Sequence, residues 1–172
     1  IAPVYLSFQI VIILNKKVRV DDMFSELIGL YVGDGDFSAK KSPHVSFINI
    51  DRDVIVFIYK MFKESFGLTQ DNMTFMINYS VGDSNELKEK WSKILSITRD
   101  IKLRKSVRNR NEALLIQINS KIFSDLFRDL IRHLLPIIGN TERLRRGFLR
   151  GYFSADGGMG VKKDPKILNL EH

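Results

Sequence analysis

The same nine-residue pattern occurs twice in this chain, and this repetition restricts the fold more than any other feature. The first copy is LIGLYVGDG, Leu27–Gly35, and the second is LRGYFSADG, Leu149–Gly157. Each copy starts with leucine, has glycine in third place and ends in Asp-Gly, so that the two aspartates lie 122 positions apart. One apolar helix that stops at glycine is ordinary, but two matched copies predict helices that act together.

Small residues within each copy predict close contact between these two helices. Gly29 and Gly33 are four residues apart, as are Gly151 and Ala155. Residues four apart lie on one face of a helix, and small side chains there let two helix backbones approach. We therefore expect a parallel helix pair with these four residues at its interface. The alternative is that each glycine packs locally against a sheet, which explains one copy better than two.

The aspartate at the end of each copy suggests a shared cation site. If the helices run parallel, Asp34 and Asp156 emerge together at the C-terminal ends, where the helix dipoles are negative and two carboxylates repel each other. A divalent cation with a preference for oxygen ligands, such as Mg²⁺, removes this repulsion. The alternative interpretation is that each aspartate caps a glycine turn, with Gly33 and Gly35 as left-handed helix stops.

Hydrophobic periodicity predicts an α+β fold with a mainly antiparallel sheet and helices on one face. Helices are expected at about 23–33, 51–67, 85–97, 120–135 and 141–155, and strands at 36–41, 44–50, 73–80 and 112–119. The predicted organisation is an N-terminal strand or extension over residues 1–21 and a first α+β domain over 22–140. Residues 141–172 would hold the second motif helix and the start of an incomplete second domain.

Composition narrows the classes of function. An apolar fraction of 44% and a charged fraction of 27% are those of a globular protein. The chain has no cysteine, which excludes disulfide scaffolds and thiolate chemistry. Its net charge of +7 favours a polyanionic partner. The apolar segment VYLSFQIVIIL is too short to cross a bilayer and has no preceding positive charge, so we expect a soluble intracellular protein, cytoplasmic or organellar, without a membrane partner.

The two motifs resemble the signature motifs of LAGLIDADG homing endonucleases, the intron- or intein-encoded nucleases of mobile elements. The resemblance covers about residues 23–159 and implies a sequence-specific nuclease that hydrolyses double-stranded DNA, with a saddle-shaped sheet and two central parallel motif helices. It implies that Asp34 and Asp156 are catalytic and bind metal, with Gly33 and Ala155 beside them in the metal site. The implied cofactor is Mg²⁺, with Mn²⁺ or Ca²⁺ as substitutes in binding.

A basic stretch and a predicted hairpin are the candidate DNA-binding surface. The stretch RDIKLRKSVRNR contains one acid and six cations, namely Arg99, Lys102, Arg104, Lys105, Arg108 and Arg110. These cations are expected to contact phosphates, although a solvated charge run is the alternative. In the hairpin, alternation places Asp36, Ser38 and Lys40 on the side that would face DNA. Lys102 and Lys105 are also the candidates for the active-site lysine that the family resemblance implies.

The resemblance leaves other functions open. Relatives of this family also act as RNA splicing cofactors or as DNA-binding regulators without cleavage, and the chain is alternatively the endonuclease part of an intein. Two-motif members have a second whole sheet after the second motif, whereas here GMGVKKDPKILNLEH follows. We therefore expect the second domain to be truncated. The chain is expected to be a monomer if complete and to self-associate if truncated.

Overall fold

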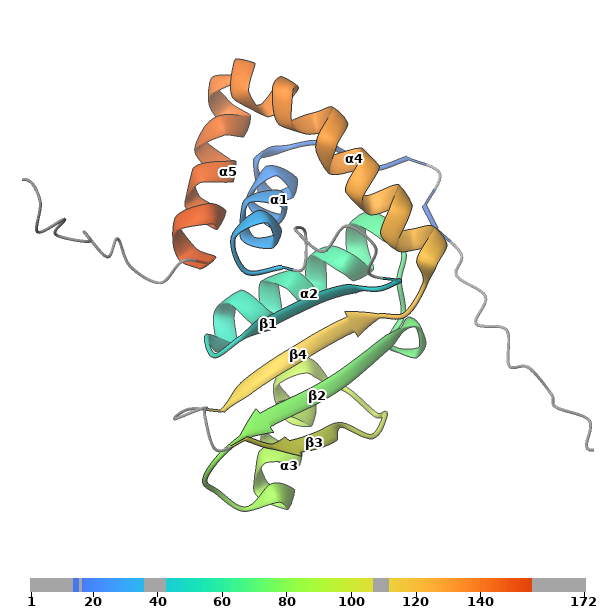
Figure 1. The fold of residues 1–172 in the computed structure, drawn as a ribbon, viewed down its shortest axis with the longest axis vertical. Coiled ribbons are helices and arrows are strands. Elements are labelled where there is room, and N and C mark those ends of the chain that lie inside the picture. The colour runs from blue at the N-terminus through green and yellow to red at the C-terminus, as the bar shows by residue number, and fades with distance from the viewer. Residues whose placement is uncertain (1–13, 16, 36–42, 107–111, 156–172) are drawn as a thin grey trace, which may run out of the picture.

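A computed structural model describes residues 14–15, 17–35, 43–106 and 112–155. Within these residues the chain forms five α-helices, a short 3₁₀ turn and one four-stranded sheet, which confirms the α+β class (Figure 1). The helices are α1 (Asp22–Asp34), α2 (Arg52–Phe66), α3 (Ser84–Leu95), α4 (Lys121–Asn140) and α5 (Glu142–Ala155). The strands are β1 (Val45–Asn49), β2 (Met73–Tyr79), β3 (Lys102–Lys105) and β4 (Ala113–Ile118), and the 3₁₀ turn η1 is Gln70–Asn72.

The sheet is mixed, with strand order β1-β4-β2-β3. Strand β4 runs antiparallel to both β1 and β2, as the expectation of a mainly antiparallel sheet requires. Strands β2 and β3 are parallel, so one of the three strand pairs departs from the antiparallel arrangement. The reason is the connection: α3 carries the chain back to the starting end of β2 before β3 begins, and such a crossover produces a parallel pair.

Strand β3 was not expected from the sequence. Three of its four residues, KLRK, are cations, a composition that indicates a solvated charged stretch. Its one apolar side chain, Leu103, packs against the core opposite Ile77 of β2. An edge strand needs a partner on only one side, and charged side chains on it discourage further strands from pairing. The formation of this strand therefore depends more on its pairing with β2 than on its own composition.

Helix α2 begins and ends as its sequence predicts. The side chain of Asp51 accepts hydrogen bonds from the backbone N–H groups of Asp53 and Val54, which satisfies free donors at the helix start. Gly67 ends the helix in the left-handed region, at φ 73° and ψ 17°. Its N–H donates to the carbonyl groups of Lys63 and Phe62, as in a glycine C-cap.

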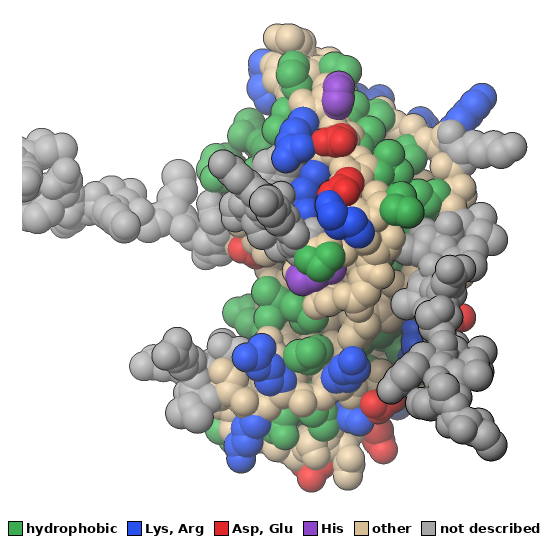
Figure 2. Space-filling view, turned by 45° about the vertical axis from the view of Figure 1, so that its right-hand side comes forward, with side chains coloured by type: hydrophobic (Ala, Val, Ile, Leu, Met, Phe, Trp, Pro, Cys, Tyr) green, Lys and Arg blue, Asp and Glu red, His purple; other side chains and the backbone are tan. Residues whose placement is uncertain are grey.

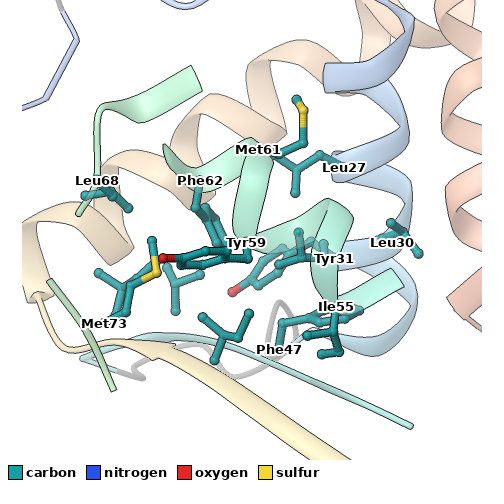
Figure 3. Close-up of a cluster of buried hydrophobic side chains, with 14 of the residues drawn as sticks. Leu27, Leu30, Tyr31, Phe47, Ile55, Tyr59, Met61, Phe62, Leu68 and Met73 are labelled. Atoms are coloured by element: carbon teal, nitrogen blue, oxygen red, sulfur yellow. The ribbon is translucent and has the colours of Figure 1, made fainter. Parts of the chain in front are cut away.

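The core lies between the sheet and the helices, and aromatic rings fill much of it. In Figure 1, α2 and α3 lie behind the strands. Phe66 meets Phe123 of α4 edge-on, with ring centroids 5.4 Å apart, and Tyr31 of α1 meets Phe127 in the same way at 4.9 Å. Figure 3 shows Tyr31 in this cluster with side chains from α2 and β1. Trp91 of α3 is buried, as its amphipathic helix predicts.

Several predicted features fall outside the described residues. They are the strand at 36–41 with Asp36, Ser38 and Lys40, the cations Arg108 and Arg110, and the acid Asp156. The predicted domains at 1–21 and 141–172 are described only in part. Leu144 and Ala155 of α5 belong to the same core cluster as the residues of the first predicted domain. In the described part of the chain, no helix combines the length and apolar character needed to cross a membrane.

Candidate active site at the end of a parallel helix pair

Helices α1 and α5 lie side by side and run in the same direction (Figure 1). Their direction follows from the order of contacts along them. Near the start of both helices Gly147 meets the backbone of Asp22, and at their ends Gly33 meets Ala155. The two copies of the sequence motif therefore form a parallel pair, as the repeat predicts.

The contact between these helices leaves no room for side chains at the glycines. A Cβ atom at Gly29 would lie 2.1 Å from the carbonyl oxygen of Phe148, and one at Gly33 would lie 2.5 Å from the Cβ of Ala155. At Gly151 the corresponding distance, to the carbonyl oxygen of Glu26, is 2.1 Å. Cβ atoms in proteins do not approach other atoms this closely. The structure thus brings together all four residues predicted for the interface.

The contacts are reciprocal between the two copies. Gly29 faces the carbonyl oxygen of Phe148 and the N atom of Tyr152, at 2.1 and 2.8 Å from an added Cβ. Gly151 faces the carbonyl oxygen of Glu26 and the N atom of Leu30, at the same two distances. Each residue in one set lies 122 positions from its counterpart in the other. An exchange of partners of this kind is the mark of an approximate two-fold axis between the helices.

The reciprocal interface extends one turn further toward the helix starts than predicted. A Cβ at Gly147 would lie 2.3 Å from the carbonyl oxygen of Asp22. The counterpart of Gly147 is Ser25, whose buried hydroxyl donates a 2.6 Å hydrogen bond to the carbonyl oxygen of Leu144. Ser25 and Gly147 lie four residues before Gly29 and Gly151, so the same spacing in the sequence would predict them as part of the interface.

Asp34, the predicted catalytic acid of the first motif, is the last residue of α1 and is half-buried. Its Oδ2 atom accepts a 2.8 Å hydrogen bond from Nδ2 of Asn49, at the end of β1. Oδ1 of Asn49 accepts a 2.7 Å hydrogen bond from the backbone N–H of Asp51. A backbone N–H can only donate, so this bond fixes which way the Asn49 amide points. Sequence reasoning did not connect Asn49 with Asp34, because only the packing of α1 on β1 brings them together.

Gly35 fixes the direction in which the chain leaves α1. It is not a left-handed stop, because its backbone is extended, with φ −81° and ψ 176°, and Gly33 lies inside the helix. Glycine is needed for space: a Cβ there would lie 2.3 Å from Cδ2 of the Tyr31 ring. Gly35 donates a 2.9 Å hydrogen bond to the carbonyl oxygen of Tyr31 and forms a β-bridge with Phe47. These contacts hold the end of α1, and with it Asp34, against β1.

The described part of this site provides one of the two acids predicted to hold metal. Asp156, which directly follows Ala155, lies outside the described residues. Among the described residues there is no group of three or more His, Asp or Glu suited to a metal ion. A half-buried carboxylate at a helix C-terminus nevertheless fits Mg²⁺, which keeps several waters and takes one or two carboxylates together with substrate phosphate.

Lys102 and Lys105 do not lie near Asp34, which corrects their assignment to the active site. Both are on β3, at the opposite edge of the sheet from β1. Three inter-strand spacings separate the two edges, or about 14 Å. A lysine side chain is much shorter than this. The spatial order of the strands, which puts β4 and β2 between β1 and β3, could not be read from the basic stretch.

Arg99, predicted to bind DNA, holds a turn of its own chain. Its Nη1 atom donates hydrogen bonds to the carbonyl oxygens of Asp71, at 2.8 Å, and Gln70, at 3.3 Å. Its Nε atom also lies 3.9 Å from the Asp71 carboxylate. Arg99 thereby ties the segment before β3 to η1.

The remaining predicted cations lie on the sheet. Alternate residues of each strand point to opposite faces, and one set is buried in the core. We call the other set the open face: it comprises Ser46, Ile48, Thr74, Met76, Asn78, Lys102, Arg104, Ala113, Leu115 and Gln117. Within this set Ala113 is buried. Figure 2 shows Lys and Arg side chains among apolar ones over the lower part of the molecule, which contains the strands. Lys102, Arg104 and Lys105 are all exposed.

The sequence repeat and the reciprocal contacts of α1 and α5 are thus the main observations on this site. The oriented carboxylate of Asp34 and the basic edge of the sheet add to them. Comparison of the chain with protein-family models, with curated proteins and with solved structures finds no match in any of the three.

Proposed function

We propose that this protein is a sequence-specific DNA endonuclease of the LAGLIDADG homing type, which hydrolyses both strands of a duplex with a divalent metal ion. The observation that carries the proposal is the reciprocity of the contacts between α1 and α5. The strands of a DNA duplex are themselves related by two-fold axes, and a protein with matching symmetry can act on both in the same way. In the sequence repeat, Asp34 is the last residue of α1, and its counterpart Asp156 directly follows Ala155, the last residue of α5.

In this proposal Asp34 and Asp156 hold the metal, which is Mg²⁺. Held by these two residues, the ion would supply Lewis acidity toward the phosphodiester and would make water a better nucleophile. The chain itself orients the acid. Asn49 directs its amide N–H at Oδ2 of Asp34, and the extended Gly35 holds the helix end against β1.

The open face and the basic edge of the sheet are proposed to bind the DNA. The major groove is wide enough to admit strands, and its base edges carry the sequence information. Lys102, Arg104 and Lys105 provide positive charge along β3 for contact with phosphates. In this role the two lysines position the duplex rather than act at the scissile bond.

The test is cleavage of a plasmid library with random inserts in the presence of Mg²⁺, followed by sequencing of the double-strand ends. We expect the protein to select one family of sites. Asp34→Asn should abolish double-strand cleavage, because the charge is lost while the new amide oxygen can still accept from Asn49. Duplex binding should stay within a few-fold. Asp125→Asn, on the exposed surface of α4, is the matched control and should cleave normally.

The outcomes separate the proposal from its alternatives. Full cleavage by the Asp34→Asn, Asp156→Asn double variant would rule out the catalytic assignment. Tight duplex or RNA binding by the wild-type protein without cleavage in Mg²⁺, Mn²⁺ or Ca²⁺ would instead favour a regulator or splicing cofactor.

A further inference from the structure

The open face carries one row of large apolar side chains. Ile48 of β1 pairs in register with Leu115 of β4, which pairs with Met76 of β2. Lys102 of β3 is the next residue in the same row. The three apolar side chains are half-buried, and none belongs to the core or packs against it. Large apolar side chains in a row outside the core point to a contact with something other than this core.

The rows on either side of this apolar row are different. On one side lie Ser46, Gln117 and Thr74, all polar and paired in register. Asn119 links two of them, since it accepts a hydrogen bond from Gln117 and donates one to Thr74 at 3.1 Å. These side chains therefore already have partners within the protein.

The other neighbouring row is small, polar and basic. It runs from Ala113 through Asn78 to Arg104 in paired register. The apolar row is consequently a single narrow stripe, about 10 Å across the three strands that carry it. At the β3 end, Lys102 continues the apolar row and Arg104 ends the neighbouring row, so two cations stand beside this end of the stripe.

This arrangement fits a polyanion with a few apolar groups better than it fits the face of another protein. An apolar protein surface laid on the stripe would bury the charge of Lys102 without a partner, which is costly. A DNA duplex places phosphates beside its major groove, where Lys102 and Arg104 can meet them. In that groove the apolar group on the edges of the bases is the C5 methyl of thymine.

We propose that Ile48, Leu115 and Met76 contact C5 methyl groups in the major groove, so that the target sites of this protein contain thymine opposite this row. The inference rests on the proposed function, because it assumes that the open face meets duplex DNA. Met76 has a flexible, polarisable side chain that adapts to the position of a methyl group. Burial of one methyl group is worth about three- to fourfold in affinity.

The experiment measures binding of the full chain to two duplexes that differ only in this methyl group, poly(dA-dT) and poly(dA-dU), at one fixed salt concentration. We expect tighter binding to poly(dA-dT), by at least threefold. A second pair, poly(dG-dC) with and without 5-methylcytosine, restores the methyl group on a different base pair. The methylated duplex should bind more tightly, which separates a methyl contact from a difference in duplex stiffness.

Variants of the apolar row test whether its side chains cause the preference for duplexes that carry the methyl group. Met76→Gln keeps the length of the side chain but makes it polar, and Leu115→Thr shortens a second member of the row while it favours the strand. Each should lower the ratio of the two affinities toward one without loss of the folded state in a thermal melt. Lys102→Gln is the matched control on the same row. It should weaken binding to both duplexes equally and reduce the log–log salt slope by about 0.9.

The possible results lead to different conclusions. Equal affinity for the methylated and unmethylated duplexes, or a preference that survives both apolar variants, would overturn the methyl contact and leave the nuclease proposal standing. No binding to any duplex at low salt would overturn both. A wild-type dimer in light scattering that Met76→Gln converts to a monomer would show that the row is an interface between copies of the chain.

Discussion

Gly29 lies so close to Phe148 of the neighbouring helix that a Cβ atom there would stand 2.1 Å from the Phe148 carbonyl oxygen. Backbone cannot give way as a flexible side chain can, so Gly29→Ala must separate α1 from α5. We expect a loss of about 1–3 kcal/mol in the free energy of unfolding, and more for Gly29→Leu. Urea denaturation measures the loss. Gly139→Ala in α4 is the control, because outside the local helix backbone no atom would lie within 4 Å of the new Cβ. If Gly29→Leu unfolds at the same urea concentration as wild type, the close contact between the two helices is refuted.

Gly151 should behave as Gly29 does, because its contacts are reciprocal. Gly151→Ala meets the carbonyl oxygen of Glu26 at the same 2.1 Å. The two single variants should therefore lose similar free energies of unfolding. Both separate the same helices, so the double variant should lose less than the sum of the two. Strictly additive losses in a double-mutant cycle would mean that the two contacts relax independently.

The hydrogen bond from Asn49 to Asp34 predicts a pH-dependent variant. Asn49→Asp replaces the donor by a second carboxylate at 2.8 Å from the first. Two negative charges this close repel, so the variant should be less stable than wild type at pH 7. The difference in melting temperature between this variant and wild type should shrink as the pH falls toward 4, where carboxyl groups take up protons. Thermal melts across this pH range test the expectation. Asn49→Ala is the control, because it removes the donor without adding a charge. Its difference in melting temperature from wild type should change less with pH.

Tyr59 predicts a loss of stability in alkaline solution. Burial raises the pKa of its phenol above the ordinary value of 10.0. Below pH 10 the group is protonated in both states and contributes nothing to the pH dependence. Above pH 10 the unfolded chain releases the proton while the folded chain keeps it, so stability falls as the pH rises, by at most about 1.4 kcal/mol per pH unit.

Tyr59→Phe removes this contribution. The free energy of unfolding of the variant, measured in urea at pH 9, 10 and 11, should decline less steeply than that of wild type. All other groups are the same in both proteins, so their contributions cancel in the comparison. Parallel declines would show that Tyr59 does not lose its proton more readily on unfolding.

Tyr31 and Phe153 occupy equivalent positions in the two motifs but differ in burial. Tyr31 is 0% exposed in the core, whereas Phe153 is 53% exposed. Tyr31→Ala should therefore cost about 3–5 kcal/mol. Phe153→Ala should cost no more than about 0.5 kcal/mol, as expected of a surface position. Denaturation of the two variants makes this comparison, and a large loss for Phe153→Ala would indicate a contact on the outer side of α5.

The helix pair could be predicted from the amino-acid sequence alone. The repeated glycines at a spacing of four predict one small-residue face on each helix, and local chemistry predicts where helices begin and end, as Asp51 and Gly67 do for α2. These features depend on residues only three or four positions apart, so they can be predicted from local sequence patterns. The position of Asp34 at the end of its helix follows in the same way.

The order of the strands and the surroundings of Asp34 could not be predicted from local sequence, because they depend on long-range packing. Strand β3 forms because β2 offers it a partner, and its edge position takes Lys102 away from Asp34. Asn49 meets Asp34 because α1 packs against β1, across a part of the chain that no local pattern spans. Strand pairing and helix packing depend on contacts between residues distant in sequence, and the free energy of those contacts is distributed over the whole core. For this reason the motif could predict the place of Asp34 in its helix, whereas the hydrogen-bond partner of Asp34 and its distance from the lysines required the fold.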